Sequence, residues 1–586
     1  MRCLFFICAG VAAGVAIAAD EREWGEIGKA EAMGWNEPLT LPTGRERVVA
    51  EHVGKTWAQV MNVTGRVRAE FEFAPADMAK KPGGYVELHL RGVKGMVNGN
   101  YNRSYPADGR VSTKDLFVLD SGTKASFGVL KEASAKEKTP PLRSRLISSE
   151  MTAALRYPDD GAEVSDNTPD FAWYSEDPLG VTLEVSSNPS FAEGSTFRRH
   201  REDAIPFITW NEPLPPGTWH WRLITGSGYV TPARTFHQTA SAAADCDPPV
   251  LHCAPDRMMT SAECYRFTVS DDAVSVSVKL AGSDLGVKRL PTAVEVIPPE
   301  GGWPIGVSKI LLSAIDAKGN AVRAVTWVSC APELPKVSWS GDGGDVNVGG
   351  VPFGLSAIYG VDRESDIDRV AAMGFNCVHS YARDGGMGGE KTIRFLDALE
   401  ARGMKTFVSV NREDVRLCRY SRIAEKIGLY LPRKCLLAWY LADEPETHDF
   451  RPVKPALFRR YCDFVKALDP TRPGIVSHNI ISCAAQRYSG CADVHFSQAY
   501  RKTLGEVESV LANHRKLFGE RQPDMKYSLI VNPRAARSAE EFAAQIAFAR
   551  THGCGFVVYA WFEALRSADT MGKLSKGMSM VGCRRD

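Results

Sequence analysis

The 586-residue sequence has no excess of either charge, because 71 Lys and Arg residues stand against 70 Asp and Glu residues and leave a formal charge of +1. A balanced chain has no overall electrostatic attraction to nucleic acid or to an anionic membrane surface. Hydrophobic residues make up 44% and charged residues 24%, which is ordinary for folded globular proteins. We therefore expect a folded chain of several domains that does not bind nucleic acid.

Apolar runs long enough to cross a bilayer are also lacking. The run from Leu4 to Ala19 falls short of the ~20 residues that a membrane span needs. Arg2 before this run and the small residues Ala16 to Ala18 at its end are typical of a signal peptide, here residues 1–19. The sequence thus predicts export to the periplasm, the extracellular space or the cell surface, with no membrane span.

Motifs for metal, redox and nucleotide chemistry are missing. None of the 14 Cys residues forms a C-x-x-C pair or a Cys/His cluster at zinc spacing, and no Walker loop or Gly-x-Ser-x-Gly elbow occurs. We expect no metal and no cofactor. Cys246, Cys253, Cys264 and Cys330 fall in one predicted β-domain, and an oxidising compartment favours two disulfides among them, with the pairing left open.

The first part of the chain predicts a β-sandwich over residues 20–150. Apolar residues occupy every second position from Val67 to Phe73, as one buried face of a sheet requires. A sequence pattern typical of strands runs from about residue 21 to residue 148, and a charged stretch that contains proline lies near its end.

Two further β-modules follow, over residues 151–240 and 246–332. In the first, a Pro-Gly turn leads into the segment Thr218 to Arg222, which contains Trp219 and Trp221. This order resembles the fibronectin type III-like modules of secreted polysaccharide-degrading enzymes, and it favours positions in the core and on the neighbouring face for these tryptophans over a sugar platform. The second module resembles a bacterial immunoglobulin-like repeat. Residues 333–350 contain many glycines and predict a linker.

Residues 351–586 change to short apolar segments that alternate with amphipathic ones. Eight strand candidates lie at 353–359, 376–381, 405–411, 436–443, 474–479, 494–500, 526–532 and 556–561. Gly374 and Gly403 stand where helices should stop, and Ser538-x-x-Glu541 is typical of a capping box. The predicted fold is multidomain, with three N-terminal β-sandwich modules followed by a C-terminal (β/α)8 TIM barrel; an open doubly wound sheet is the alternative.

Polar and aromatic residues collect at the carboxyl ends of these strands, where barrels carry their chemistry. The residues assigned to substrate binding are Tyr359, His379, Tyr381, Asn411, His478, Asn479, Tyr500, Asn532 and Trp561. Amides, imidazoles and flat rings together suit a ligand with many hydroxyls and apolar ring faces. The simplest such ligand is a sugar.

The strongest motif is Ala438-Trp-Tyr-Leu-Ala-Asp-Glu-Pro-Glu446. It resembles the fourth-strand signature of retaining barrel glycoside hydrolases, in which Asn-Glu-Pro ends the strand and the Glu is the acid/base. The resemblance implies that Glu444 is the proton donor, and Trp439, Tyr440 and Leu441 would supply the apolar walls that such an acid needs. The alternative is a helix start, with Asp443 as the cap and Pro445 in the first turn.

The second carboxylate departs from that pattern, because Asn532 stands at the end of the seventh strand where the family has its nucleophilic Glu. Two alternatives remain. Asp443 would orient the 2-acetamido group of a substrate, as in N-acetylhexosaminidase-type families with adjacent Asp-Glu pairs, or Glu563 would act, with Trp561 as the floor for the sugar. Asp443 and Glu444 share the mouth of the barrel only if the strand ends or bulges there.

These residues favour an exported glycoside hydrolase acting on a polysaccharide or complex glycan, with Glu444, Asp443 and Glu563 as the catalytic candidates. A catalytically inactive glycan-binding or adhesion protein is the alternative. The sugar, the linkage and the oligomeric state are left open by the sequence.

Overall fold

The computed structural model describes residues 23–34, 41–74, 84–91, 97–102, 109–113, 115–118, 123–131, 140–177, 180–202, 205–239, 247–339, 346–381, 389–410, 412–445, 453–478, 485–519, 522, 526–552 and 555–582. The chain divides into two units. One comprises residues 1–256, 261–303 and 308–328, and the other comprises residues 257–260, 304–307 and 329–586.

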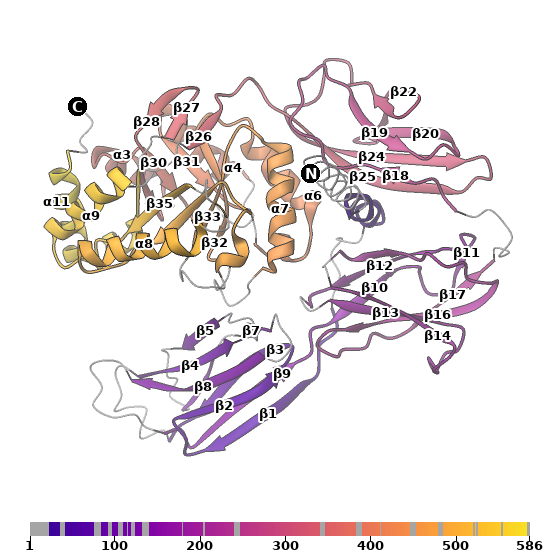
Figure 1. Ribbon diagram of the computed structural model, residues 1–586, viewed down its shortest axis with the longest axis horizontal. Helices are drawn as coiled ribbons and strands as arrows, with labels where there is room; N and C mark the ends of the chain where they lie inside the picture. The colour runs from indigo at the N-terminus through magenta and orange to yellow at the C-terminus, as the bar shows by residue number, and fades with distance from the viewer. Residues whose placement is uncertain are drawn as a thin grey trace, which may run out of the picture. The chain divides into compact units, whose positions relative to one another are not determined.

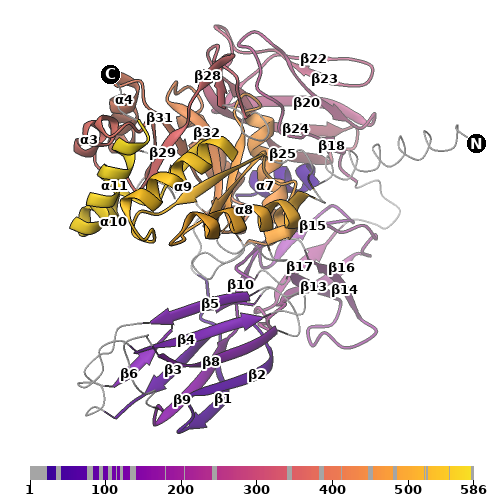
Figure 2. The same ribbon diagram turned by 60° about the vertical axis from the view of Figure 1, so that its left-hand side comes forward.

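The first unit begins with a sandwich of two antiparallel sheets, seen as two layers in Figure 2. One sheet has the order β1 (Glu46–Val53), β9 (Arg143–Ser149), β3 (Arg66–Glu72), β6 (Arg110–Ser112), with β7 (Leu116–Phe117) also on β3. The other has the order β2 (Trp57–Val63), β8 (Thr123–Lys131), β4 (Gly84–Arg91), β5 (Val97–Asn102). Val67, Ala69 and Phe71 are buried, so the predicted alternation is confirmed.

Residues 23–32 are helical, although the sequence reads as strand-rich from residue 21. Trp24 and Ile27 are buried, and the Trp24 ring meets Trp327 edge-on at 6.4 Å. A Cβ at Gly28 would lie 2.5 Å from the carbonyl oxygen of Val325, so only glycine lets the helix approach that strand so closely. The helix therefore packs on the third β-module.

The second β-module pairs a three-stranded and a five-stranded sheet. Their orders are β10 (Ala153–Tyr157), β12 (Asp170–Ser175), β15 (Phe207–Thr209) and β11 (Ala162–Val164), β17 (Arg234–Gln238), β16 (Gly217–Thr225), β13 (Val181–Ser186), β14 (Thr196–Arg201). Trp219 and Trp221 are 5% and 0% exposed. Phe171 meets Trp221 edge-on at 5.2 Å, so both tryptophans belong to the core, which confirms that they form no sugar platform and corrects the neighbouring-face position.

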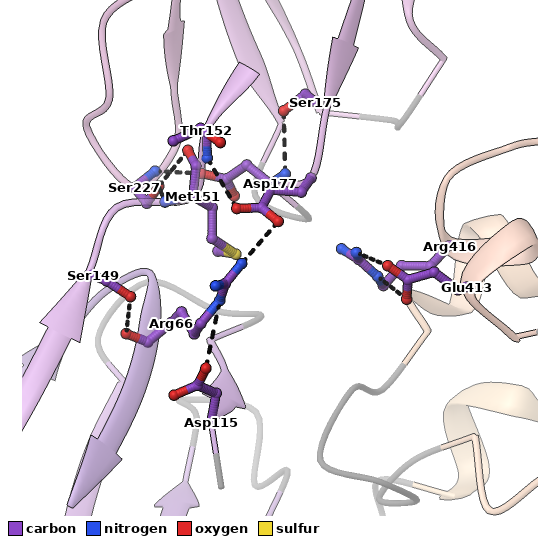
Figure 3. Close-up of polar contacts among 11 residues, drawn as sticks. Arg66, Asp115, Ser149, Met151, Thr152, Ser175, Asp177, Ser227, Glu413 and Arg416 are labelled. Atoms are coloured by element: carbon purple, nitrogen blue, oxygen red, sulfur yellow. Dashed lines mark hydrogen bonds and ion pairs between the residues drawn. The ribbon is translucent and has the colours of Figure 1, made fainter. Parts of the chain in front are cut away.

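Polar contacts fix the junction between these two modules (Figure 3). Arg66 of β3 forms an ion pair with Glu176 at 2.8 Å and lies 4.0 Å from Asp115. The backbone N–H of Met151 donates to the Ser227 hydroxyl at 2.9 Å, and the Ser227 N–H donates to Asp177 at 2.7 Å. The short connection after β9 is thus held by side chains from both modules.

The third β-module also has two sheets. Their orders are β18 (Leu251–His252), β19 (Tyr265–Val269), β23 (Val294–Val296), β22 (Val287–Arg289) and β21 (Ser283–Asp284), β20 (Ala273–Leu280), β24 (Gly306–Asp316), β25 (Ala321–Cys330). Cys253, Cys264 and Cys330 carry free thiols, so the expectation of two disulfides here is wrong, and Cys246 lies outside the described residues. Burial raises the pKa of the Cys253 thiol to about 12, so that Cys253 behaves as an apolar core residue.

The second unit is built on a closed barrel of eight parallel strands, which confirms the predicted closure and excludes the open sheet (Figure 1). The strands are β29 (Ser356–Tyr359), β30 (Cys377–His379), β31 (Lys405–Val408), β32 (Leu436–Asp443), β33 (Gly474–His478), β34 (Val494–Gln498), β35 (Lys526–Val531) and β36 (Phe556–Val558). Alternate residues, among them Ala357, Phe407, Tyr440 and Ile530, form one buried cluster inside the barrel.

The segment predicted as a flexible linker differs from that expectation. Its strands β26 (Val337–Trp339) and β27 (Val346–Val348) form an antiparallel sheet with β28 (Val351–Phe353). Trp339 and Val346 are buried in the same cluster as the barrel interior. The large apolar side chains among the glycines decide this outcome, because their burial in the barrel core outweighs the flexibility of the glycines.

Helices surround the barrel. They are η1 (Glu364–Asp366), α3 (Ile367–Ala372), α4 (Glu390–Ala401), α5 (Arg412–Arg416), α6 (Tyr420–Tyr430), α7 (Pro455–Leu468), η3 (Ala485–Tyr488), α8 (Leu504–Gly519), α9 (Ala539–His552), α10 (Trp561–Arg566) and α11 (Ala568–Met580). Gly374 and Gly403 have φ of +93° and +62°, as predicted for helix ends. The Glu541 N–H donates to the Ser538 hydroxyl at 3.3 Å, which confirms that cap. None of the described helices has both the length and the hydropathy of a membrane span.

Candidate active site

The site lies at the carboxyl ends of the barrel strands and begins with a chain of hydroxyls inside the barrel. The Tyr359 hydroxyl, at the end of β29, donates to the Tyr440 hydroxyl of β32 at 3.0 Å. The Tyr440 hydroxyl in turn donates to Asp443 Oδ1 at 2.8 Å. His379 lies against both tyrosine rings, each with a centroid separation of 4.9 Å. Buried aromatic groups thus orient one oxygen of the Asp443 carboxylate.

A bulge in β32 turns Asp443 toward the inside of the barrel. Tyr440 is paired with Ile475, but Ala442 is paired with Val476, so one extra residue, Leu441, stands in β32. The Leu441 side chain lies over Gly474, where an added Cβ would be 2.5 Å from Leu441 Cδ1. Because side chains alternate along a strand, this extra residue places Asp443 on the same face as Tyr440. Asp443 can face the mouth of the barrel only if the strand ends or bulges there, and this bulge meets that condition.

Glu444 follows at the point where the strand stops. Its φ is +49°, in the left-handed region that a non-glycine residue rarely adopts, and its N–H donates to the Ser477 carbonyl at 2.9 Å. Gln498 Nε2, from the end of β34, donates to Glu444 Oε1 at 2.6 Å. Pro445 lies in a turn, and residues 446–452 lie outside the described residues, so the helix-start alternative stays a prediction.

Glu563 comes from α10 and meets the end of the seventh strand. Asn532 Nδ2 donates to Glu563 Oε2 at 3.3 Å, and Arg534 Nη1 donates to Glu563 Oε1 at 3.1 Å. The Glu563 side chain is 17% exposed. Asn532 therefore stands where the family resemblance predicts a carboxylate, and it holds a carboxylate that another segment supplies.

Burial and the charges of the three carboxylates together raise the pKa of one tyrosine hydroxyl. The pKa of Tyr559, directly after β36, is raised to about 12 by burial and by the negative charges of Glu563, Asp443 and Glu444. Burial and nearby acidic groups, Asp443 among them, also raise the pKa of Tyr381 and Tyr500 well above the usual tyrosine value. Asp443, Glu444 and Glu563 thus lie at one end of the barrel, among partly buried tyrosine rings.

Four of the residues assigned to substrate binding are fully buried. Tyr359 and His379, 1% and 0% exposed, lie inside the barrel and support Asp443 instead of contacting a ligand, and the other two face away from the site. Trp561 is fully buried, with the Arg369 guanidinium of α3 5.1 Å from its ring centroid, so no open ring face remains for a sugar. His478 is also fully buried, and its Nε2 lies 3.1 Å from Nδ1 of His495. Its ring lies 5.3 Å from Phe518 of α8, in the layer between the strands and the helices. Asn411 and Asn479 lie outside the described residues.

The walls around Glu444 also differ from those expected. Trp439 donates its Nε1–H to Asp469 at 2.9 Å in a buried contact, and Leu441 lies over Gly474, so neither of them lines the site. Gln498, Tyr559 and Arg534 contribute instead. The last predicted strand ran three residues too far, since β36 ends at Val558. A prediction that ended this strand at Val558 would have placed Tyr559, rather than Trp561, at its carboxyl end.

The buried histidines behind β33 and β34 predict acid sensitivity. Burial lowers the pKa of His514 to about 3 and that of His495 well below its usual value. The unfolded chain binds protons on these residues near pH 6.5 and the folded chain does not. The contribution of these two histidines to the free energy of unfolding is therefore fully present above about pH 6.5. It is lost as the pH drops toward 3, by at most about 1.4 kcal/mol per pH unit for each histidine.

Urea unfolding midpoints measured between pH 7 and pH 5 test this expectation. His514→Gln should flatten the dependence, because it removes one of the two protonation sites, whereas His552→Gln on the exposed end of α9 should not. An unchanged slope in His514→Gln would contradict the assignment.

Comparisons with known proteins found similar solved structures but no similar sequence. No family model matches the chain, and neither does any curated protein. Among solved structures, a GH2 beta-galacturonidase from Eisenbergiella tayi bound to glycerol matches 94% of this chain and 99% of its own, with 10% identity and a TM-score of 0.33. A glycosyl hydrolase family 2 member from Bacteroides cellulosilyticus matches 86% of this chain and 58% of its own, with 11% identity and a TM-score of 0.28. Beta-glucuronidase 3 from Bacteroides uniformis matches 86% and 61%, with 10% identity and a TM-score of 0.29.

These neighbours are all glycoside hydrolases by their names. At such scores the likeness carries no argument about activity or substrate, and the barrel assignment rests on the strand pairing of this chain.

Proposed function

We propose that the barrel hydrolyses glycosidic bonds in a polysaccharide or complex glycan, with Glu444 as general acid and Glu563 as the second carboxylate. One observation carries this proposal: Gln498 at the end of β34 and Asn532 just after the neighbouring strand β35 hold Glu444 and Glu563 by hydrogen bonds, so carboxylates from two separate segments stand at one end of the barrel. Hydrolysis of a glycosidic bond uses two carboxyl groups, one to protonate the leaving oxygen and one to attack the sugar or activate water. The signal-like residues 1–19 make export part of the same proposal.

The surroundings suit these two roles. Gln498 orients Glu444 through a hydrogen bond to one carboxylate oxygen, Oε1. Asn532 and Arg534 each hold one oxygen of Glu563, which fixes the plane of that carboxylate. Tyr381 packs on Tyr359 and Tyr500 packs on Tyr559, and these three partly buried rings leave some apolar surface and their hydroxyls for a sugar.

A second mechanism has a specific observation in its favour. The bulge at Leu441 brings Asp443 to the inner face of the barrel, next to Glu444 in sequence. Asp443 would then orient a 2-acetamido group whose carbonyl oxygen attacks the sugar, while Glu444 donates the proton. This mechanism restricts the enzyme to 2-acetamido sugars, whereas the mechanism with Glu563 does not.

Turnover on a panel of glycans tests the proposal. The purified chain is incubated with polysaccharides and with aryl glycosides, half of which carry a 2-acetamido group, and the release of reducing sugar or aryl alcohol is followed. Hydrolysis of any member supports the proposal. Binding without turnover across the panel would favour the alternative, an inactive glycan-binding or adhesion protein.

Replacing Gln498 with leucine should lower kcat about tenfold and leave KM within a factor of about two. The reason is that Gln498 contacts Glu444, whose proton-donating form is neutral, and a hydrogen bond between neutral groups contributes about 0.5–1.5 kcal/mol, the upper end of which is about tenfold in rate. Steady-state kinetics on the best panel substrate measure both constants, and thermal unfolding shows that the variant folds. A change confined to KM would mean that Gln498 binds the sugar instead of orienting the acid.

A further inference from the structure

The outer face of one sheet in the first sandwich carries an unusual tryptophan. Trp57 opens β2 and is paired with Gly128 of β8. A Cβ at Gly128 would lie 2.2 Å from Trp57 Cε3 and 2.9 Å from Cδ2, so the indole lies directly on the bare glycine backbone. Even so, Trp57 is 37% exposed. One face of the ring is thus supported by the sheet while much of the residue remains in contact with solvent.

Polar groups stand beside this ring, on the next strand. Glu87 of β4 is also paired with Gly128, and His89 is paired with Ser126. His89 Nε2 and Glu87 Oε2 are 2.6 Å apart, and the His89 ring centroid lies 6.1 Å from that of Trp57. Val86 and Leu88 fill the sandwich core, so Glu87 and His89 point to the outer face with Trp57.

The fold does not require this arrangement. The outer face of a sheet usually carries solvated polar side chains, and a large ring laid on a glycine buries only one of its faces. Glu87 is only 8% exposed, although it lies outside the core. A half-open aromatic ring beside an oriented carboxylate and imidazole is the combination that binds a sugar, with C–H groups on the ring and hydroxyls on the polar pair.

We infer that Trp57, Glu87 and His89 form a glycan-binding site on the first sandwich, separate from the barrel chemistry. Its ligand is an uncharged sugar unit of a polysaccharide, because an anionic sugar would place its charge next to the Glu87 carboxylate. The site would hold the chain on a polymer and would contribute little to the binding of a small glycoside.

Affinity gel electrophoresis of the full chain tests the site, with xyloglucan, arabinogalactan and barley β-glucan as neutral probes and polygalacturonate as the anionic probe. At least one neutral polysaccharide should retard the protein. Trp57→Ala should weaken that binding at least tenfold, and Trp57→Tyr should retain much of it, since a flat ring remains. Leu142→Ala removes a side chain that is 55% exposed from the same sandwich and should change nothing.

The outcomes separate this site from the proposed activity, because binding is measured without turnover. Binding of a neutral probe that Trp57→Ala reduces and Leu142→Ala does not reduce supports the site, whether or not the barrel is active. Retention of full affinity in Trp57→Ala, retardation by polygalacturonate alone, or no retardation by any probe would overturn it. Thermal unfolding of each variant excludes loss of fold as the cause.

Discussion

Glu444→Gln is expected to lower kcat by about a thousandfold on substrates with a poor leaving group. General acid catalysis contributes roughly 10²–10⁴ to the rate, and glutamine keeps the shape of the side chain while removing the proton that it would donate. The position supports this role, since Glu444 directly follows β32 at the carboxyl end of the barrel, next to Asp443 and within hydrogen-bond distance of Gln498. Initial rates on the best panel substrate, at saturating concentration, measure the loss.

The leaving group provides a sharper test of the same role. A dinitrophenyl group departs without a proton, so Glu444→Gln should retain most of its glycosylation rate on a dinitrophenyl glycoside and lose it on an alkyl glycoside. Glu425→Gln is the matched control, because Glu425 is exposed on α6 of the same barrel. Equal turnover by wild type and Glu444→Gln on both substrates would end the assignment.

Much of the barrel could be predicted from the sequence because its signals are local. Short apolar segments, glycines at helix ends and a capping serine each depend on a few neighbouring residues. Gly374, Gly403 and Ser538 behave as these patterns predict. The motif around Glu444 could be found for the same reason, since the residues that end β32 are consecutive.

The failures concern the direction of side chains. His478 sits near a strand end, as predicted, but the alternation along β33 turns it away from the barrel interior and toward α8. The bulge at Leu441, which brings Asp443 inside, depends on the pairing of β32 with β33, and no single segment encodes it. The same limit applies to Trp339, whose burial in the barrel core could not be read from a glycine-rich segment.

Glu563 is the other residue whose loss should nearly abolish activity. Glu563→Ala is expected to lower kcat by about a thousandfold, because it removes the carboxylate that attacks the sugar or activates water. Asn532 and Arg534 then face an empty space with two hydrogen-bond donors. A small anion such as azide should enter that space and restore part of the rate. Asp569→Asn, at a side chain that is 74% exposed on α11, is the control and should remain fully active.

Asp443→Asn distinguishes the two mechanisms when it is measured beside Glu563→Ala. If Glu563 is the second carboxylate, azide rescues Glu563→Ala, the product is a glycosyl azide or its hydrolysis product, and Asp443→Asn keeps more activity than Glu563→Ala. If the substrate supplies the nucleophile, the order reverses: Asp443→Asn loses activity, Glu563→Ala keeps it, and turnover is confined to 2-acetamido sugars. Because Tyr440 donates to Asp443, Tyr440→Phe should lower the activity on the same substrates as Asp443→Asn, by a smaller factor. The reversed order would assign the second catalytic role to Asp443 at the end of β32 instead of Glu563 on α10.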